Sequence, residues 1–371
     1  MESDRAEAGA GAPMRADIRR QPEILTRLLA RRDEFLAAGQ SWLAPGPGGR
    51  LFVIGCGDGL FAARAAGVLA GETANLPWTP TGALAAVLSR ARFRREDRAV
   101  VISMSGNVDR TVEAALAARD AGVPVLALCN GGGGRLASAA DARLSLDIPD
   151  LAPFLCGTST YTGTLLALLL LAAGAAGGPV PVAAFEGAIA VMGDAETAAD
   201  RAIEGMLAAT GPPTGVRFLS AGANAGTADY GAAKLVELCR TPSWSDDLEE
   251  FAHSRYWSMP TSDLVVLVGG ERALARYATV SADALARLGV VTLAIDTTDA
   301  PVPAAAYRVT LAALPGFVAP LAGAVPLQVL AYRLAVATGF DPDRRLHLKQ
   351  DETRFRVSRL LTRRSLVDTG Q

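Results

Sequence analysis

The chain has 371 residues, half of them hydrophobic, and its 36 basic and 38 acidic side chains leave a net charge of −2. So much apolar surface excludes a mostly disordered chain, and the near-neutral charge excludes an electrostatic nucleic-acid binder. The four cysteines form no CxxC pair, which indicates neither a disulfide framework nor a zinc site and fits a cytoplasmic protein. With two histidines and no acidic cluster at ligand spacing, we expect no metal and no cofactor.

The N-terminal region, residues 1–48, combines a polar lead with a helix. Residues 1–13 lack the apolar core of a secretory signal, so we expect a disordered lead. Apolar side chains recur at helical spacing over 14–38, and the Pro and Gly residues at 45–49 end that helix.

Residues 49–180 alternate short apolar strands with helices, which predicts a parallel sheet covered on both faces. We expect strands at 51–55, 75–78, 99–103, 123–129 and 144–148 and helices at 60–69, 82–91, 108–121 and 162–176. The apolar run at 165–176 is shorter than the roughly 20 residues that a membrane span needs, so we interpret it as a buried core helix.

A helical linker at 181–212 leads to a second half at 213–340 with the same alternation. We expect strands at 216–220, 264–268, 290–295 and 307–311 and helices at 230–239, 272–288 and 321–338. The predicted fold is therefore α/β, with two tandem doubly wound, flavodoxin-like domains followed by a charged tail at 341–371. Ligands of such sheets bind at the carboxyl ends of the strands.

Two loops that follow strands of the first half are candidates for ligand binding. The segment Ser103-Met-Ser-Gly-Asn-Val-Asp-Arg-Thr111 places hydroxyls and free amides at a helix start, which suits an anion or sugar oxygens. Alternatively, Ser105 or Asn107 only caps the helix. The Gly55-Cys-Gly-Asp-Gly59 loop is a weaker candidate, and it lacks the third glycine of the dinucleotide fingerprint.

Lysine is rare in this chain: Lys234 and Lys349 are its two lysines, and arginine supplies the other basic residues. An amine acts as a compact cation and can lose its proton, which a guanidinium does not do. Lys234 and Glu237 are three residues apart and share one helical face. Such a pair is ordinarily a surface ion pair; the apolar neighbourhood adds the alternative of a buried glutamate that serves as a base. Lys349 lies in the tail segment Gly339–Thr353.

These segments together resemble the sugar isomerase (SIS) family, and within it the isomerase half of glucosamine-6-phosphate synthase, over about residues 20–360. The segment 102–111 is similar to the ISxSGxTxET sugar-phosphate loop of that family. The helix at 231–237 is similar to its GALKxKE helix, with Lys234 and Glu237 on matching positions. The tail is similar to the ending DPDxPRxLxKxxET, with Lys349 on the lysine position and one residue fewer before Arg345.

The resemblance implies two SIS domains, a homodimer and a ketose–aldose isomerisation. Glu237 would move a proton between C1 and C2 of the sugar. His253, from a neighbouring subunit, would assist ring opening, and Lys349 would lie over the active site. Lys234 would hold charge near the enediolate. A carboxylate base, a ring-opening acid and a cation are the groups that a proton transfer between adjacent carbons needs.

The chain also departs from the family pattern. It has no N-terminal nucleophilic cysteine, so we expect any nitrogen to come as ammonia rather than from glutamine. At the phosphate loops, hydroxyl or polar positions of the family are Gly59, Met104 and Val108 here, and Asp58 stands where a threonine is usual. A carboxylate beside a phosphate dianion would cost several kcal/mol, so we expect an unphosphorylated or otherwise modified sugar, unless Asp58 caps the next helix.

The predicted function is an aldose–ketose isomerase for a sugar or sugar phosphate, which works either without a nitrogen step or coupled to ammonia-dependent amination or to deamination of an aminosugar. The alternative is a non-catalytic SIS module that binds a sugar. The candidate substrate contacts are Cys56, Gly57, Asp58, Gly59, Ser103, Met104, Ser105, Asn107, Val108, Thr158 and His347. We expect neither a nucleic acid nor a membrane as a partner.

Overall fold

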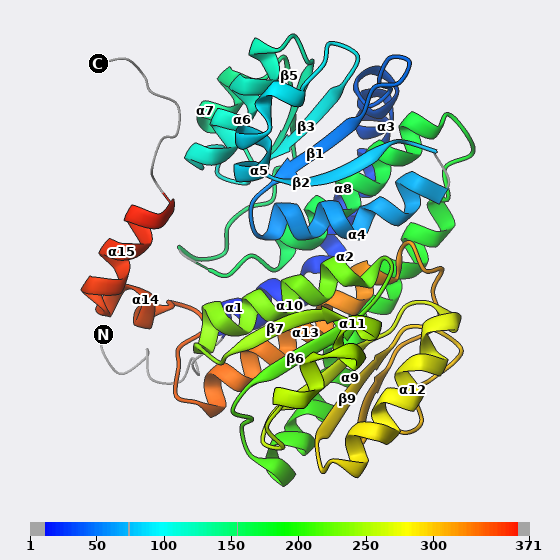
Figure 1. Ribbon diagram of the computed structural model, residues 1–371, viewed down its shortest axis with the longest axis vertical. Helices are drawn as coiled ribbons and strands as arrows, with labels where there is room; N and C mark the ends of the chain where they lie inside the picture. Colours follow the sequence, from blue (N-terminus) through cyan, green and yellow to red (C-terminus); the bar gives the residue numbers. More distant parts are fainter. Residues whose placement is uncertain (1–11, 73–74, 154, 363–371) are drawn as a thin grey trace. The chain divides into compact units, whose positions relative to one another are not determined.

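The computed structural model describes residues 12–72, 75–153 and 155–362, and within them it contains two five-stranded parallel sheets (Figure 1). The described residues pack as two units. Unit A contains residues 24–72, 75–149, 160–181 and 348–362, and unit B contains residues 12–23, 150–153, 155–159 and 182–347. Residues 150–153 and 155–159 belong to unit B, and the domain bounds 49–180 and 213–340 stay a prediction.

Unit A has the strand order β2-β1-β3-β4-β5, which is the flavodoxin-like order. Its strands are β1 (Leu51–Gly55), β2 (Trp78–Gly82), β3 (Arg98–Ile102), β4 (Val125–Cys129) and β5 (Ala142–Ser145). Alternate strand residues such as Phe52 and Val101 form one core with α5 (Ala83–Leu88), α6 (Asp109–Asp120) and α7 (Gly134–Ala139). Helix α4 (Asp58–Glu72) packs against β1 and β2.

Two glycines let α3 (Arg32–Trp42) and α8 (Ser159–Ala176) approach until their backbones touch. A Cβ atom on Gly39 would lie 2.1 Å from the carbonyl oxygen of Leu171, and one on Gly174 would lie 2.2 Å from that of Leu36. Larger side chains at either glycine would push the helices apart. The contact therefore fixes α8 against the N-terminal helices.

Unit B repeats the topology with the order β10-β9-β8-β6-β7. Its strands are β6 (Val216–Ser220), β7 (Ser243–Asp247), β8 (Leu264–Val268), β9 (Val291–Asp296) and β10 (Tyr307–Thr310). Helices α10 (Asn224–Cys239) and α9 (Val182–Thr210) both pack against α13 (Ala319–Ala337). The opposite face forms a core with α11 (Leu248–His253) and α12 (Arg272–Arg287), which bury Leu219, Val265 and Leu267 of the sheet.

Helices α8 and α13 are long and apolar enough to cross a membrane, but 83% of each is buried inside the protein. Burial on this scale is typical of core helices. The interpretation of the run at 165–176 as a core helix agrees with this packing.

Most predicted elements are present, with several differences, among them helix α7, which was not predicted, and β2, which begins at Trp78 where the expected strand ends. The helix expected at 14–38 is three helices, α1 (Ala12–Arg19), α2 (Gln21–Ala30) and α3, with breaks at residues 20 and 31. Strand β7 and helix α11 were not predicted. The tail contains two helices, α14 (Leu346–Gln350) and α15 (Glu352–Thr362).

Candidate functional site

A charged cluster lies on the last turns of α10 in unit B. The ammonium of Lys234 lies 2.7 Å from Oε2 of Glu237, as the spacing of three residues on one helical face predicts. Lys234 is only 4% exposed, and its Nζ lies 5.3 Å from the centre of the Tyr230 ring. The lysine therefore holds its charge inside the protein beside a carboxylate and an aromatic face.

The same carboxylate has a second cationic partner that the sequence did not predict. Arg345, from the segment before α14, binds Oε1 of Glu237 and donates a further hydrogen bond of 3.2 Å to the carbonyl oxygen of Leu155. Arg345 adopts a φ of +47°, a left-handed conformation that costs a residue other than glycine about 1 kcal/mol or more. The ion pair and the hydrogen bond of its guanidinium offset the free-energy cost of this conformation. Its only sequence signal is its position in the DPD-R-LxK tail.

Lys234 and Arg345 keep Glu237 ionised. Burial by itself would raise the pKa of the Glu237 carboxyl, but the charges and hydrogen bonds of Lys234 and Arg345 outweigh burial and hold that pKa below its ordinary value. Each carboxylate oxygen of Glu237 contacts one cation, Oε2 with Lys234 and Oε1 with Arg345. The group is thus in its basic form at neutral pH, and one oxygen must be released before it takes a proton.

His347 fastens the tail segment to the end of α10. Its Nε2 lies 2.9 Å from the backbone carbonyl oxygen of Glu237, so this nitrogen carries the proton and donates. Arg240 donates a 2.6 Å hydrogen bond to the carbonyl oxygen of His347, and the ring of Phe340 meets the imidazole edge-on at 4.8 Å. Nδ1 is buried and has no hydrogen-bond partner among the described residues. Burial is the largest cause that lowers the pKa of His347.

The side chain of Lys349 lies outside the described residues. Its backbone belongs to α14, two positions after His347.

His253 and Glu237 lie at opposite edges of sheet B. Strands β6 and β7 are parallel and in register. Helix α10 follows β6 and ends at Cys239, just before β7 begins, which places Glu237 at the amino edge. Helix α11 starts at Leu248, directly after β7, so His253 lies at the carboxyl edge. Five residues of strand separate these edges by about 13 Å.

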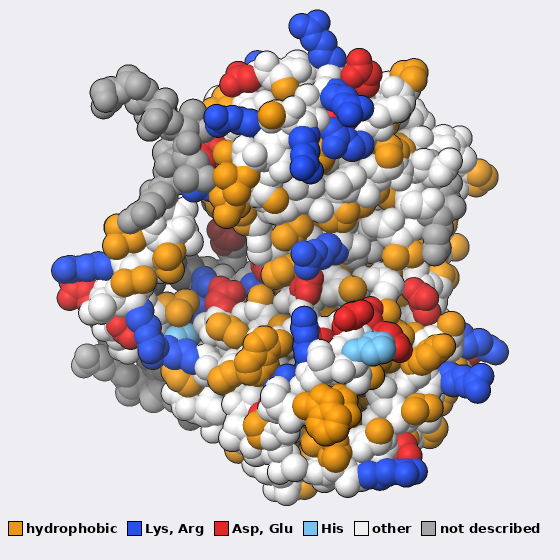
Figure 2. Space-filling view, in the orientation of Figure 1, with side chains coloured by type: hydrophobic (Ala, Val, Ile, Leu, Met, Phe, Trp, Pro, Cys, Tyr) orange, Lys and Arg blue, Asp and Glu red, His pale blue; other side chains and the backbone are white. Residues whose placement is uncertain are grey.

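The surroundings of His253 are exposed and acidic. Its side chain is 68% exposed, and Nε2 lies 3.1 Å from Oε1 of Glu249. Figure 2 shows acidic side chains gathered over α11. A groove of about 730 Å³ runs between α11 and α12, with Asp247, Glu249 and Tyr277 among its lining residues. Within unit B, the structure does not bring His253 to Glu237.

In unit A, the two loops singled out in the sequence follow β1 and β3, where the strand order reverses and doubly wound sheets bind ligands. The start of α4 packs against the end of β3, because a Cβ atom on Gly59 would lie 2.9 Å from Cγ2 of Ile102. The Ser103 hydroxyl is buried, with 6% of the residue exposed, and has no partner among the described residues. Cys56 and Gly57 are exposed, and Asp58 is half-buried.

Asn107 shapes its own loop. Its Nδ2 donates a 2.8 Å hydrogen bond to the carbonyl oxygen of Ser105, and its Oδ1 accepts one of 3.2 Å from the amide of Arg135. The backbone amide of Asn107 donates to the Ser105 hydroxyl at 3.2 Å. That hydroxyl keeps its own proton to donate. Val108 precedes α6 and is exposed.

The charges beside this crevice are already paired. Arg135 pairs with Asp109 and Arg110 pairs with Glu113. Asp58 adds a further carboxylate in the first turn of α4. The helix starts of α4 and α6 add positive potential beside these ion pairs.

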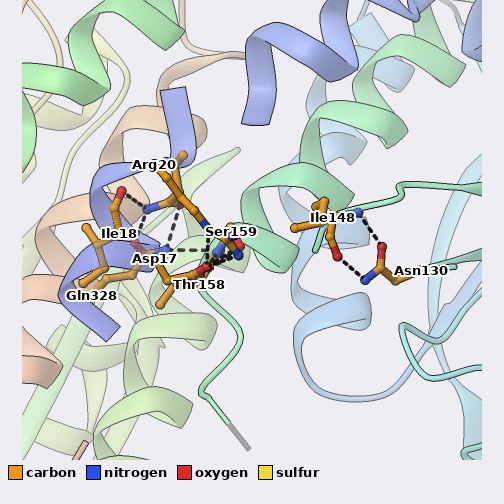
Figure 3. A network of polar contacts seen from close by, with 9 residues as sticks. Asp17, Ile18, Arg20, Asn130, Ile148, Thr158, Ser159 and Gln328 are labelled. Atoms are coloured by element: carbon orange, nitrogen blue, oxygen red, sulfur yellow. Dashed lines mark hydrogen bonds and ion pairs between the residues drawn. The ribbon is translucent and has the colours of Figure 1, made fainter. Parts of the chain in front are cut away.

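Two other candidates make contacts inside the protein. The Met104 sulfur accepts a hydrogen bond from Thr164 at 3.5 Å. Thr158 is fully buried and donates its hydroxyl to Asp17 in unit B, which also accepts from the amide and hydroxyl of Ser159, each at 3.0 Å (Figure 3). A separate network in unit A, also drawn in Figure 3, pairs Asn130 with the backbone of Ile148 through two hydrogen bonds of 2.8 Å. Thr158 thus ties its segment to unit B.

Among the described residues, no three His, Cys, Asp or Glu side chains are grouped so that they would hold a metal ion.

Comparison with known proteins supports the resemblance. Residues 47–174 match the SIS domain family. The chain is similar to the C-terminal domain of glucosamine-fructose-6-phosphate aminotransferase from Francisella tularensis, with a TM-score of 0.76, 18% identity, and coverage of 91% of this chain and 99% of that one. The chain is also similar to tagatose-6-phosphate ketose/aldose isomerase from Escherichia coli, with a TM-score of 0.72, 19% identity, and coverage of 89% of this chain and 94% of that one.

Glucosamine-6-phosphate deaminase from Thermotoga maritima is also similar, with a TM-score of 0.67, 18% identity, and coverage of 86% of this chain and 97% of that one. Among curated proteins, none matches the chain by sequence. The likeness to these structures confirms the predicted fold, two tandem flavodoxin-like α/β domains, over nearly the whole chain.

Proposed function

We propose that this chain, whose residues 47–174 form a SIS domain, is an aldose–ketose isomerase of sugars in which Glu237 is the base. The observation that carries the proposal is the Glu237 carboxylate, kept ionised between the buried Lys234 and Arg345. Structural relatives named as phosphosugar isomerase, deaminase and aminotransferase support the class of reaction.

The reaction is a proton transfer between neighbouring carbons. Glu237 takes the proton from C2 of the open-chain aldose, the electron pair moves to O1, and an enediolate forms. Returning the proton to C1, while the hydroxyl proton of O2 passes to O1 and O2 becomes the carbonyl oxygen, gives the ketose, so no electrons are gained or lost. Lys234 stabilises the negative charge on the enediolate oxygen. Arg345 must release Oε1 of Glu237, and the substrate oxygens are the natural new partner for its guanidinium.

Ring opening needs an acid at the ring oxygen, and we assign this step to His253 of a second subunit. Its position at the opposite edge of sheet B supports delivery across a subunit boundary, because it is exposed and distant from Glu237 in its own chain. Lys349 is proposed to lie over the bound sugar. These assignments make the enzyme a homodimer.

We propose that the loops of unit A bind an unphosphorylated sugar group. Ser103 and Ser105 supply hydroxyls, and the arginines beside them are already paired with carboxylates. A phosphate dianion would add charge next to Asp58. Replacing Asp58 by Asn should therefore strengthen binding of fructose 6-phosphate and inorganic phosphate by about tenfold and leave fructose binding unchanged. If the wild-type protein already binds the phosphate ester more tightly than fructose, this part is wrong.

Nitrogen chemistry extends the same mechanism. Condensation of ammonia with the ketose carbonyl releases water and gives an imine, and proton transfer from C1 to C2 of this imine gives the 2-amino aldose; in the reverse direction water hydrolyses the imine and ammonia is released. Turnover of fructose or glucosamine, with and without ammonium, distinguishes this from plain isomerisation.

Exchange of the C2 proton in heavy water tests the base directly. We expect exchange of a turned-over sugar with the wild-type protein and with Glu204→Gln, an exposed glutamate of α9, and none with Glu237→Gln at unchanged secondary structure. Wild-type exchange in Glu237→Gln would remove the mechanism. Binding without exchange in the wild-type protein would instead support a non-catalytic sugar-binding module.

A further inference from the structure

Several contacts hold the tail segment on unit B, and His347 makes two of them; Asp343 also accepts a 2.8 Å hydrogen bond from the amide of Met14. His347 donates from Nε2 to the backbone of Glu237, and its own carbonyl accepts from Arg240. Arg345, two residues earlier, binds the Glu237 side chain. Both ends of Glu237, backbone and carboxylate, are therefore bound by residues of the same short segment.

The imidazole is placed so that it can hold this position only while neutral. Protonation would put an N–H on the buried Nδ1, which faces no acceptor among the described residues. The charged groups around the ring are Arg240 and Glu237 from α10 and Arg345 from the tail segment, and Phe340 packs on it as an apolar neighbour. Since Glu237 is already neutralised by Lys234 and Arg345, a positive imidazole would meet two guanidiniums and no free carboxylate.

We propose that His347 is a pH-sensitive latch, which holds the tail segment on α10 when it is neutral and releases it when it is protonated. Helix α14 starts at Leu346, so release of His347 frees the helix that contains the backbone of Lys349. It also frees Arg345 from its strained conformation over Glu237. A loss of catalysis at acidic pH rests on the proposed function, whereas release of the segment does not.

The small number of histidines makes the latch testable. His253 and His347 are the two histidines of the chain, and Glu237 stays ionised between pH 7.5 and 5.0 because its pKa lies below the ordinary value. Amide hydrogen exchange of peptides that cover 341–350, corrected for the intrinsic rate at each pH, reports the segment without any substrate. We compare the wild-type protein with His347→Gln, which keeps a donor but does not titrate, and with His253→Gln as the matched control.

We expect protection of 341–350 to fall about tenfold from pH 7.5 to 5.0 in the wild-type protein and in His253→Gln, the change expected for loss of one hydrogen bond. In His347→Gln, protection should be the same at both pH values. An equal fall in His347→Gln, or constant protection in the wild-type protein, would overturn the latch. Either result leaves the C2 exchange test of Glu237 unaffected, so failure of the latch and failure of the isomerase are distinguishable.

Discussion

The guanidinium of Arg345 binds the carboxylate of Glu237, a residue 108 positions earlier in the chain. This ion pair joins the C-terminal segment to the end of α10, and it places a second cation on a carboxylate that Lys234 already holds. The pair is mostly buried, with side-chain exposures of 17% and 28%. Removing this ion pair should therefore change the free energy of unfolding of the protein.

Replacing Arg345 by Gln should lower the free energy of unfolding by about 1–3 kcal/mol at neutral pH, because Glu237 loses one of two buried partners. The pKa of Glu237 is lower in the folded than in the unfolded protein. Its stabilisation is thus fully present above the ordinary pKa of 4.5 and is lost as the pH falls through the lowered value. Urea unfolding from pH 7 to 3 should show the difference from wild type shrinking below about pH 4.5. The neighbouring Arg344→Gln, at an exposed position, should match wild type; a difference independent of pH would contradict the ion-pair account.

The Asp17 carboxylate should be essential to unit B. It accepts hydrogen bonds from Thr158, Ser159 and Arg20, all at least partly buried. Asp17→Ala leaves these donors without an acceptor and should cost about 2–4 kcal/mol in thermal or urea unfolding. Asp33→Ala, at a side chain that is 92% exposed, should change stability by less than about 0.5 kcal/mol. Equal effects of the two variants would show that the network contributes little.

Two glycines of unit A with similar backbone angles should respond differently to alanine. Gly106 has φ +64°, and a Cβ atom there would lie 1.8 Å from the carbonyl oxygen of Gly133. Gly131 has φ +63° and no atom within 4 Å of its Cβ position. Gly131→Ala should cost only the left-handed strain, about 1 kcal/mol, whereas Gly106→Ala should add about 1–3 kcal/mol for the clash. Similar melting temperatures would mean that the loops shift apart without cost.

Mixed dimers test whether His253 acts across a subunit boundary. Glu237→Gln and His253→Asn should each be inactive alone. After unfolding and refolding together in equal amounts, half of the dimers are mixed, and each mixed dimer has one intact site. We therefore expect roughly a quarter of wild-type activity to return, by simple statistics of random pairing. No recovery in dimers shown by native mass to be mixed would place His253 and Glu237 in the same subunit or outside catalysis.

The regular core was predictable because its patterns are local. Helix α9 was expected as the linker at 181–212 and is Val182–Thr210, and β6 has its expected bounds. Strand β7 was missed because its sequence, SWSDD, has no apolar alternation; it lies at a sheet edge, where one side needs no partner strand. The N-terminal helix was expected to be continuous, since the apolar spacing does not reveal the breaks at residues 20 and 31.

In the candidate site too, contacts between residues close in the sequence were predictable and contacts between distant residues were not. The pairing of Lys234 with Glu237 follows from their spacing on one helix. Arg345 was not predicted as a partner, because spacing along the sequence does not show which residues the fold brings back to α10. The hydrogen bond from the Thr158 hydroxyl to Asp17 was not predicted for the same reason.

The touching backbones of α3 and α8 have a practical consequence for anyone who shortens this protein. A version that starts at Leu51, the first strand, would lack α3 and leave the groove along Gly174 of α8 bare. That strip consists of leucine, alanine and glycine and would be open to water, which favours self-association into insoluble material. The N-terminal helices are thus part of the minimal folding unit, although they contribute no residue to either sheet.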